Sequence, residues 1–434
     1  MKIEEIESTS AEVLVSPNKA ASPSTCLKVA LLTGGMDPHY SIGLACALAE
    51  SGIKVDFIGS DEHDHPALGR ALGLRFYNLR GNHQSNSGQL WKLLKLFIYY
   101  LQLLRYAATS TCPIFHILWN NRVEMIDRTL LMIYYKALGK RIAITVHNVN
   151  AGRRDGKDSL FNRTTLKYQY LSADCLFVHT SRMKQELIDK FQIRDSAITV
   201  IPHPINCVLP DTGLTQTEAR HRLNISEKEK VLLFFGAIRP YKGLDDLVTA
   251  FAPLVAADSS HRLIIAGAPK KESRQYAEKI QGQIRRNLPS GSAVWRMEFI
   301  PDDEAEMYFK AADVLVLPYK EIFQSGVLFI AYGYGLPVIA TDVGSFRENI
   351  CEGETGFICP PNDPQALTQA IQTYFASNLF HKLIQHRAAI RKFALREHSW
   401  QQVAVLTQNA YLQTLHLSTR PASGKPSPFQ NELS

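Results

Sequence analysis

The sequence lacks the patterns of several common protein classes. Its seven cysteines are scattered, and no two have Cys-x-x-Cys spacing, so neither a zinc ribbon nor a disulfide-rich secreted scaffold is indicated. The longest apolar stretch, residues 90–104, contains two lysines and is too short to span a bilayer. The first 25 residues have acids near the start and no apolar core, unlike a secretory signal peptide. We therefore expect free thiols, a reducing compartment and a cytoplasmic location.

Strong charge of either sign is also missing. The chain has 48 Lys and Arg against 41 Asp and Glu, a net charge of +7 over 434 residues. No basic run with interleaved aromatic residues appears, so a nucleic-acid-binding protein is not indicated. The mild positive excess is compatible with anionic small substrates or with an anionic membrane surface. The apolar content of 45% and the length predict a globular protein of two domains.

Short apolar runs alternate with helical patterns through most of the chain. Expected strands of the first half are residues 27–33, 53–59, 74–79, 113–119, 141–147, 175–179 and 198–201. Those of the second half are residues 231–235, 263–267, 294–300, 314–318, 337–341 and 356–359. Residues 202–226 contain three prolines and are expected to be a linker. The alternation predicts an α/β fold with two parallel, doubly wound sheets and a ligand cleft between them.

One stretch in the second half has the arrangement of a phosphate-binding turn. Residues 231–251 read as a buried strand, a turn bounded by Gly236 and Gly243, and a helix with an apolar face. Arg239 and Lys242 place two cations three residues apart in that turn, a spacing suited to a diphosphate. The alternative is that both are solvated side chains of a surface loop.

A second stretch, residues 312–345, contains another strand followed by a helix start. Ser325 can cap that helix, and the free N–H groups around Gly326 can hold an anion. Glu321, at the exit of the strand, is placed either to accept hydrogen bonds from sugar hydroxyls or simply to face water. No Asp-x-Asp arrangement is found that would hold a divalent metal on a nucleotide diphosphate. Arg239 and Lys242 could supply that neutralisation instead.

Two further positions in the first half are candidates. Gly35 follows the first strand in a Gly-Gly turn, which is either a tight turn or a phosphate contact, and Gly-x-Gly-x-x-Gly is absent. His147 ends a strand at the presumed cleft, and is favoured for a site role over a hydrogen-bonded core histidine. Four histidines lie near strand ends, but they do not have metal-ligand spacing.

The segment from Leu90 to Tyr106 has an unusual pattern. Its polar residues form one narrow stripe at helical spacing, consisting of Lys92, Lys95, Tyr99, Gln102 and Tyr106. A surface helix with one buried face would have a wider polar side. We therefore expect a fully packed core helix, with contact to lipid as the alternative.

Taken together, these residues resemble the retaining glycosyltransferases of family 4, which have the GT-B architecture of two Rossmann-like domains. The resemblance runs from about Leu27 to Leu415 and rests on Gly236–Gly243, on residues 312–319 and on Gly335–Gly344. It implies an N-terminal acceptor domain at residues 26–205 and a C-terminal donor domain at 206–396. A helix at 397–416 would cross back to the first domain, and residues 1–25 and 417–434 would be disordered tails.

The resemblance also implies roles for single residues. Catalytic roles fall on His147, Arg239, Lys242 and Glu321, and donor-binding roles on Gly35, Gly236, Gln324, Ser325, Gly326 and Val327. The family usually has a second acid eight positions after the first, and here Phe329 or Ile330 holds that place. The stretch from Gln324 to Leu328 is similar to a branch of bacterial exopolysaccharide-type transferases.

The sequence thus predicts a metal-independent retaining hexosyltransferase with no cofactor. It would move a sugar from a UDP- or GDP-linked nucleotide donor to a glycan or lipid-linked acceptor in polysaccharide biosynthesis, with peripheral membrane contact at the inner face. Two alternatives stay open. One is a GT-B epimerase or phosphorylase, and the other is a catalytically silent sugar-nucleotide-binding protein, which the missing second acid makes plausible.

Overall fold

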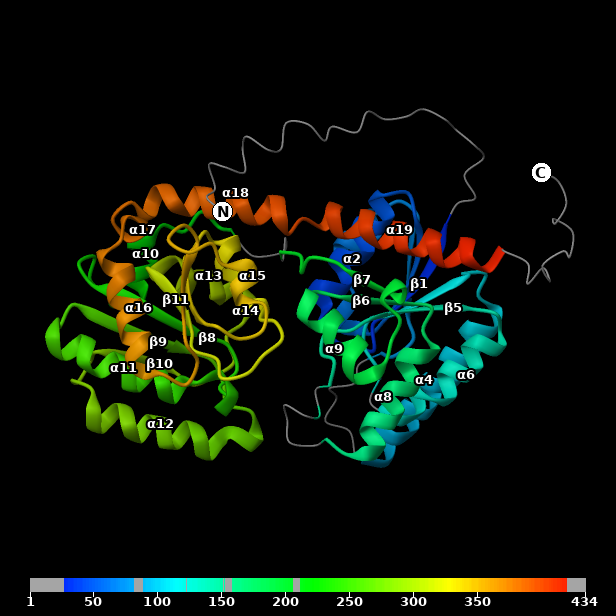
Figure 1. Cartoon of the computed structure of the whole chain (residues 1–434), viewed down its shortest axis with the longest axis horizontal. Coiled ribbons are helices and arrows are strands. Elements are labelled where there is room, and N and C mark those ends of the chain that lie inside the picture. The colour runs from blue at the N-terminus through cyan, green and yellow to red at the C-terminus, as the bar shows by residue number, and fades with distance from the viewer. Residues whose placement is uncertain are drawn as a thin grey trace, which may run out of the picture.

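The computed structural model describes residues 27–81, 89–121, 123–150, 152, 158–205 and 211–419, which form two α/β domains (Figure 1). The N-terminal sheet has the order β3-β2-β1-β4-β5-β6-β7, and the C-terminal sheet has the order β10-β9-β8-β11-β12-β13. All pairings in both sheets are parallel. The predicted fold class is confirmed.

Every expected strand is present, within a few residues of its predicted bounds. The N-terminal strands are β1 (Lys28–Leu32), β2 (Lys54–Gly59), β3 (Leu74–Asn78), β4 (Ile114–Ile117), β5 (Arg141–Thr145), β6 (Cys175–Val178) and β7 (Ile198–Val200). The C-terminal strands are β8 (Lys230–Phe235), β9 (His261–Ala266), β10 (Ala293–Arg296), β11 (Val314–Leu317), β12 (Val338–Thr341) and β13 (Gly356–Cys359). The continuous apolar runs of inner strands such as β8 and β11 follow from burial of parallel strands on both faces, whereas the edge strands β3 and β10 are only partly buried.

Helices cover both faces of each sheet. Those of the first domain are α2 (Pro38–Glu50), α3 (Pro66–Arg70), α4 (Gln89–Thr109), α5 (Glu124–Arg128), α6 (Leu130–Ala137), α8 (Leu160–Ser172) and α9 (Ser181–Phe191). Those that follow are α10 (Gln216–Arg222), α11 (Leu244–Ala257), α12 (Arg274–Asn287), α13 (Asp302–Ala311), α14 (Gly326–Gly333), α15 (Phe346–Asn349), α16 (Pro364–Ala376), α17 (Asn378–His381), α18 (Leu383–Glu397) and α19 (Trp400–Thr419).

The expected linker at residues 202–226 is in part a helix of the second domain. A capping box between Thr215 and Glu218 starts α10, because each side chain accepts a hydrogen bond from the other residue's backbone amide. Arg220 on this helix forms a buried ion pair with Asp313, with both Nη2–carboxylate distances at 2.8 Å. The short apolar pattern of α10 gave no clear signal in the sequence. Residues 206–210 of the predicted linker lie outside the described residues.

The final helix, α19, crosses from the second domain onto the first (Figure 1). The Tyr411 hydroxyl lies 2.6 Å from His116 Nδ1 in the buried core, and His116 Nε2 lies 2.8 Å from the Thr145 hydroxyl. Trp400 packs so closely on Gly43 of α2 that a side chain at position 43 would overlap its ring. The helix continues to Thr419, three residues beyond its predicted end at residue 416. The rest of the predicted C-terminal tail and residues 1–26 lie outside the described residues.

The prediction of a fully packed core helix at residues 90–106 is also wrong. Within α4, Tyr99 and Tyr106 are buried, whereas Trp91, Phe97 and Leu101 are exposed. Of the polar stripe, Tyr99 and Tyr106 face the domain, where their hydroxyls have hydrogen-bond partners, whereas Lys92 and Gln102 are exposed. Within the described part of the chain, no helix has both the length and the hydropathy that crossing a membrane requires.

Candidate active site

The turn after β8 lies at the carboxyl edge of the C-terminal sheet. Gly236 has a φ of +100°, and Gly267 at the end of β9 approaches its carbonyl oxygen so closely that a side chain at 267 would overlap it. Gly243, with a φ of +65°, lies against the carbonyl oxygen of Pro318 after β11. The glycines therefore allow the ends of three neighbouring strands to meet at one place.

Lys242 is folded back into this turn and is only 8% exposed. Its Nζ lies 5.2 Å from the centre of the Tyr319 ring and 3.3 Å from the position that a Cβ on Gly236 would take. Among the described residues, no carboxylate pairs with this ammonium group and no hydrogen bond from Nζ is found. Burying a lysine without a counter-ion costs folding free energy, and an anionic ligand bound beside the ammonium group would offset that cost.

Arg239 lies at the start of the same turn, just before a 3₁₀ turn at Pro240–Lys242. Its Nη2 is 3.7 Å from a carboxylate oxygen of Glu272, which is largely exposed, and its guanidinium lies 5.9 Å from the centre of the Tyr241 ring. Because the pair is long and one partner faces water, a phosphate could compete for Arg239 at a small cost. The structure places Arg239 on the same turn as Lys242.

The N-terminus of α14 lies beside the lysine. Val327 Cγ2 is 3.6 Å from the place that a Cβ on Gly236 would occupy. The buried Ser325 hydroxyl is 3.4 Å from the hydroxyl of Tyr319, the residue whose ring Lys242 lies over. The expected capping by the Ser325 side chain is wrong, since no such hydrogen bond is present. The first turn of a helix leaves N–H groups without intrahelical acceptors and carries a partial positive charge. Lys242 and the start of α14 therefore form one positive, partly buried corner.

Two predicted residues on the preceding loop are less engaged. Glu321 is exposed, and in the described part of the chain its carboxylate has no ion pair or hydrogen bond. Gln324 is half-buried. The loop between them is fixed from the other side, because Gly344, at a φ of +60°, packs on the carbonyl oxygens of Ile322 and Phe323. The structure thus puts both residues on the loop that leads into α14, and neither side chain has a hydrogen bond or ion pair with Lys242 among the described residues.

On the N-terminal side, His147 is a neutral, tightly packed imidazole. Its ring stacks on Trp119 with centroids 4.0 Å apart and planes at 4°, and it meets the Tyr40 ring edge-on at 4.9 Å. Burial, with the nearby His203 and His116, holds the pKa of His147 well below its usual value. Its Nε2 has no hydrogen-bond partner among the described residues, which leaves an acceptor or donor for a ligand.

Gly35 also lies on this side, in a turn that continues directly into α2. Its φ is +72°, and a side chain there would overlap the guanidinium of Arg80. Arg80 Nη1 in turn donates to the carbonyl of Gly34. Asp37 then caps α2 by accepting a hydrogen bond of 3.1 Å from the Tyr40 amide. The turn is therefore fixed by Arg80 on one side and by the helix start on the other.

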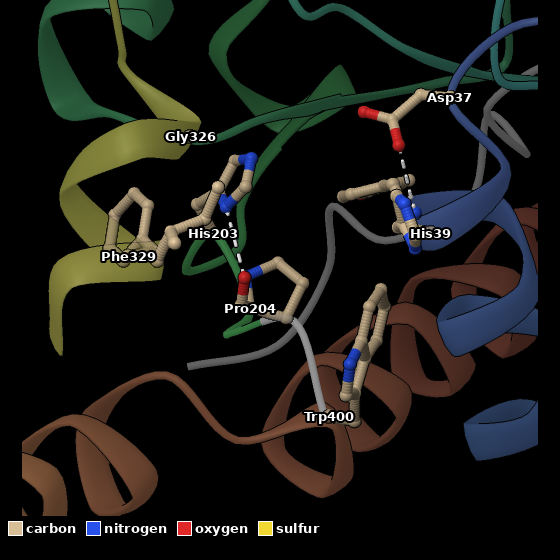
Figure 2. A pocket seen from close by; sticks show the side chains of 9 residues that line it. Asp37, His39, His203, Pro204, Gly326, Phe329 and Trp400 are labelled. Carbon is tan, nitrogen blue, oxygen red and sulfur yellow. Dashed lines mark hydrogen bonds between the residues drawn. The ribbon is translucent and has the colours of Figure 1, made fainter. Parts of the chain in front are cut away.

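A cavity of about 150 Å³ joins the two sides (Figure 2). The residues around it come from the first turn and α2, from the segment that follows β7, from α14 and from α19: Asp37, His39, Tyr40, His203, Pro204, Gly326, Phe329, Ile330 and Trp400. His203 stacks on Phe329 at 4.7 Å with planes at 9°. The place that the resemblance gives to a second acid falls on Phe329 or Ile330, and both are apolar side chains that line this cavity.

Sequence reasoning missed several residues that shape the site. Lys320 forms ion pairs of 2.8 Å with Asp245 and 3.5 Å with Asp246, which attach the loop before α14 to the start of α11. His39 Nε2 lies 2.7 Å from the Asp302 carboxylate and bridges the two domains. Spacing could not find these pairs, because their partners lie 75 and 263 positions away in the chain.

Two family models match different halves of the chain. Residues 39–209 match the model described as Glycosyltransferase Family 4, and residues 229–377 match the one described as Glycosyl transferases group 1. An uncharacterized glycosyltransferase of Methanocaldococcus jannaschii is 26% identical over 282 residues, which are 64% of this chain and 70% of that protein. The D-inositol 3-phosphate glycosyltransferase of Corynebacterium diphtheriae is 27% identical over 52% of this chain, which spans 54% of that relative's length.

Solved structures share the fold over almost the whole described chain. The sucrose-phosphate synthase of Thermosynechococcus elongatus superposes with a TM-score of 0.71 at 20% identity, covering 90% of this chain and 100% of that one. HepE of Anabaena, solved in complex with UDP and glucose, gives a TM-score of 0.66 at 16% identity with the same coverage. The two family matches and the shared two-domain architecture support a family-4-type glycosyltransferase with the GT-B fold.

Proposed function

We propose that this chain transfers a hexose, with retention and without a metal ion, from a nucleoside diphosphate donor. The donor, UDP- or GDP-linked, would bind at the carboxyl edge of the C-terminal sheet, and the acceptor would enter from the N-terminal domain. The acceptor class that we propose is a glycan or a lipid-linked sugar at the inner face of the membrane, in exopolysaccharide biosynthesis. No cofactor beyond the donor is required in this proposal.

The observation that carries the proposal is the buried Lys242 beside the start of α14. Negative charge builds on the leaving diphosphate during sugar transfer, and the site must stabilise it. Lys242, Arg239 and the amides near Gly326 provide fixed positive groups on neighbouring segments. Each such group is worth about 2–4 kcal/mol when it is preorganised in a site that excludes water.

A reaction that retains the configuration at the anomeric carbon without an enzymic nucleophile is compatible with the groups that surround the cavity. Among the described residues that line the cavity, Asp37 has the one carboxylate, and this group already accepts the Tyr40 amide as the cap of α2, so it is a poor candidate for a nucleophile. Attack by the acceptor on the same face of the sugar, with the leaving phosphate accepting the acceptor's proton, needs no enzymic nucleophile. His147 would then contact the donor sugar through its unpartnered Nε2 while remaining neutral.

Arg239→Ala tests the diphosphate role. After a thermal-shift screen with UDP-, GDP- and ADP-sugars identifies the donor, the variant is expected to lose about 100-fold in kcat/KM. Arg396→Ala, which removes another ion-paired arginine on α18, is the control and should retain activity. Near-normal transfer by Arg239→Ala would exclude the proposed role.

Analysis of products with donor alone separates a transferase from an epimerase, because only an epimerase converts the sugar without an acceptor.

Glu321→Gln tests the contact with the donor sugar. In this proposal the exposed Glu321 carboxylate, on the loop that leads into the positive corner, accepts hydrogen bonds from hydroxyl groups of the donor sugar. The variant is therefore expected to discriminate poorly between donor sugars. Its affinity for the nucleoside diphosphate alone should not change. A loss of diphosphate affinity with unchanged sugar preference would contradict this placement.

A further inference from the structure

The outward face of α4 is apolar, although the helix also contains polar residues. Trp91 is 54% exposed, Phe97 60% and Leu101 49%, and Leu94 and Ile98 are exposed beside them. Residues 91, 94, 98 and 101 share one side of a helix, and Phe97 borders it. We call these five side chains the α4 apolar face. Scattered apolar side chains are normal on a surface, but a continuous face of this kind marks an interaction site.

The orientation of α4 is fixed by hydrogen bonds on its inner side. The Tyr99 hydroxyl donates to Asn121 Oδ1 at 2.6 Å, and the Tyr106 hydroxyl donates to Asp56 Oδ2 at 2.7 Å. Tyr100 adds a third bond, of 3.1 Å, to Asp127. Rotating the helix to bury its apolar face would break all three bonds. The fold therefore holds the apolar face outward.

The neighbouring α6 extends this surface. The Tyr134 hydroxyl of α6 donates to the Leu104 carbonyl of α4 at 3.2 Å, so the two helices lie side by side. Leu130 and Ile133 of α6 are 61% and 53% exposed. In Figure 1 both helices lie along the outer edge of the first domain, away from the second domain.

Positive charge gathers on the same part of the chain. Residues 89–174, from the start of α4 to the Asp174 that pairs with Lys136 and Arg141, include 13 Lys and Arg and 5 Asp and Glu, a net +8 against +7 for the whole chain. The helix α4 itself contains Lys92, Lys95 and Arg105 and no acid. Lys92 and Arg105 are exposed, and within the described chain neither forms an ion pair.

We propose that the α4 apolar face docks onto the surface of an anionic lipid bilayer. An amphipathic helix that combines large apolar side chains with flanking cations binds in the plane of such a surface, with its apolar face among the acyl chains. A second copy of this chain fits less well, because a symmetric pair would bring two positively charged surfaces together. The bilayer satisfies both the apolar face and the charge.

This surface is connected to the first turn of the candidate site. The Arg80 guanidinium lies 5.7 Å from the centre of the Tyr99 ring of α4, and Arg80 Nη1 donates to the Gly34 carbonyl. Docking through α4 would therefore hold the Gly34-Gly35 turn behind the helix, connected to its inner side through Arg80. That a lipid-borne acceptor enters there rests on the proposed function, whereas the docking itself does not.

Vesicle flotation of the full chain tests the docking without any sugar donor. The wild type is expected to float with phosphatidylcholine vesicles containing phosphatidylglycerol, and less with phosphatidylcholine alone or in high salt. Phe97→Ser with Leu101→Ser should lower the partition coefficient at least about tenfold, because two large apolar side chains leave the acyl region. The control pair is Ile384→Ser with Leu395→Ser, which removes side chains that are 84% and 56% exposed on α18 and should float like the wild type.

Three results would overturn the proposal. They are absence of wild-type flotation with the anionic vesicles, equal flotation of the α4 and α18 pairs, and a wild-type dimer that only the α4 pair dissociates. Unchanged thermal melting shows that the α4 pair folds normally. Transfer to a water-soluble acceptor, measured without vesicles, distinguishes failure of the docking from failure of the proposed transferase activity.

Discussion

Replacing Lys242 with methionine removes a positive charge while keeping most of the side-chain length. The lysine is 8% exposed, its ammonium group lies over the Tyr319 ring, and it has no counter-ion among the described residues. If it is there to hold a diphosphate, the substitution should weaken ligand binding without weakening the fold. If the lysine instead has a structural role, the substitution should weaken the fold without weakening ligand binding.

The magnitudes follow from these contacts. The cation–π contact with Tyr319 is worth about 2 kcal/mol, and removing an uncompensated buried charge offsets that loss. We therefore expect the free energy of unfolding of the ligand-free Lys242→Met protein to be unchanged or slightly higher. A charge-assisted hydrogen bond to phosphate contributes about 2 kcal/mol, which corresponds to about a 30-fold loss of affinity.

Calorimetric titration with the nucleoside diphosphate and with its nucleoside separates the two explanations. Lys242→Met should bind the diphosphate weakly and the nucleoside normally. Lys320→Met is the matched control: its charge is already paired with Asp245 and Asp246, so it should lower stability in urea denaturation. Equal loss of both ligands by Lys242→Met, or undiminished diphosphate affinity, would refute the reasoning.

Two further predictions concern stability. Gly243→Ala should lower the free energy of unfolding by about 3 kcal/mol, since it adds overlap with the Pro318 oxygen to the strain of a φ of +65°. Gly213→Ala, at a φ of +78° with nothing within 4 Å, is the control and should cost only about 1 kcal/mol in the same urea titration. Equal losses would contradict the close approach of the turn to β11. Burial lowers the pKa of His116 from 6.5 to about 3, so the unfolded chain takes up a proton that the folded chain refuses as the pH falls below 6.5. Its contribution to stability should therefore decrease by about 2 kcal/mol between about pH 7 and pH 5, measured by urea denaturation. A wild-type stability that is flat over that range, or a His116→Gln variant with the same slope, would contradict this assignment.

The sheets could be predicted from the sequence because parallel strands buried on both faces are continuous apolar runs. The run from Val231 to Phe235 is one example, and it lies at the centre of the second sheet. The glycine-bounded turn was equally readable, since Gly236 and Gly243 stand where a positive φ is needed. Local chemistry determines these features, and local sequence therefore reports them.

The orientation of α4 could not be predicted in the same way. The two tyrosines of its polar stripe point inward because Asp56 and Asn121, from distant segments, accept hydrogen bonds from Tyr106 and Tyr99. Periodicity shows that a helix has two faces, but it does not show which face has partners. The partners are a property of the tertiary structure.

A cleft between the two domains was predicted, but most of the residues that line the cavity were missed for a related reason. Tyr40, His203, Phe329 and Trp400 lie in four separate segments, and none has a pattern that points to the others. The replacement of the second family acid by Phe329 or Ile330 was visible in the sequence. Only the structure shows that Phe329 stacks on His203 and closes one side of the cavity.

The central claim is that the donor diphosphate binds between Lys242 and the N-terminus of α14. A crystal structure of the protein with the nucleoside diphosphate that stabilises it most would test this claim directly. The account predicts phosphate oxygens within hydrogen-bonding distance of Lys242 Nζ and of the amides at Gly326 and Val327. A diphosphate bound elsewhere, with Lys242 still over the Tyr319 ring and no phosphate in contact with it, would contradict the claim.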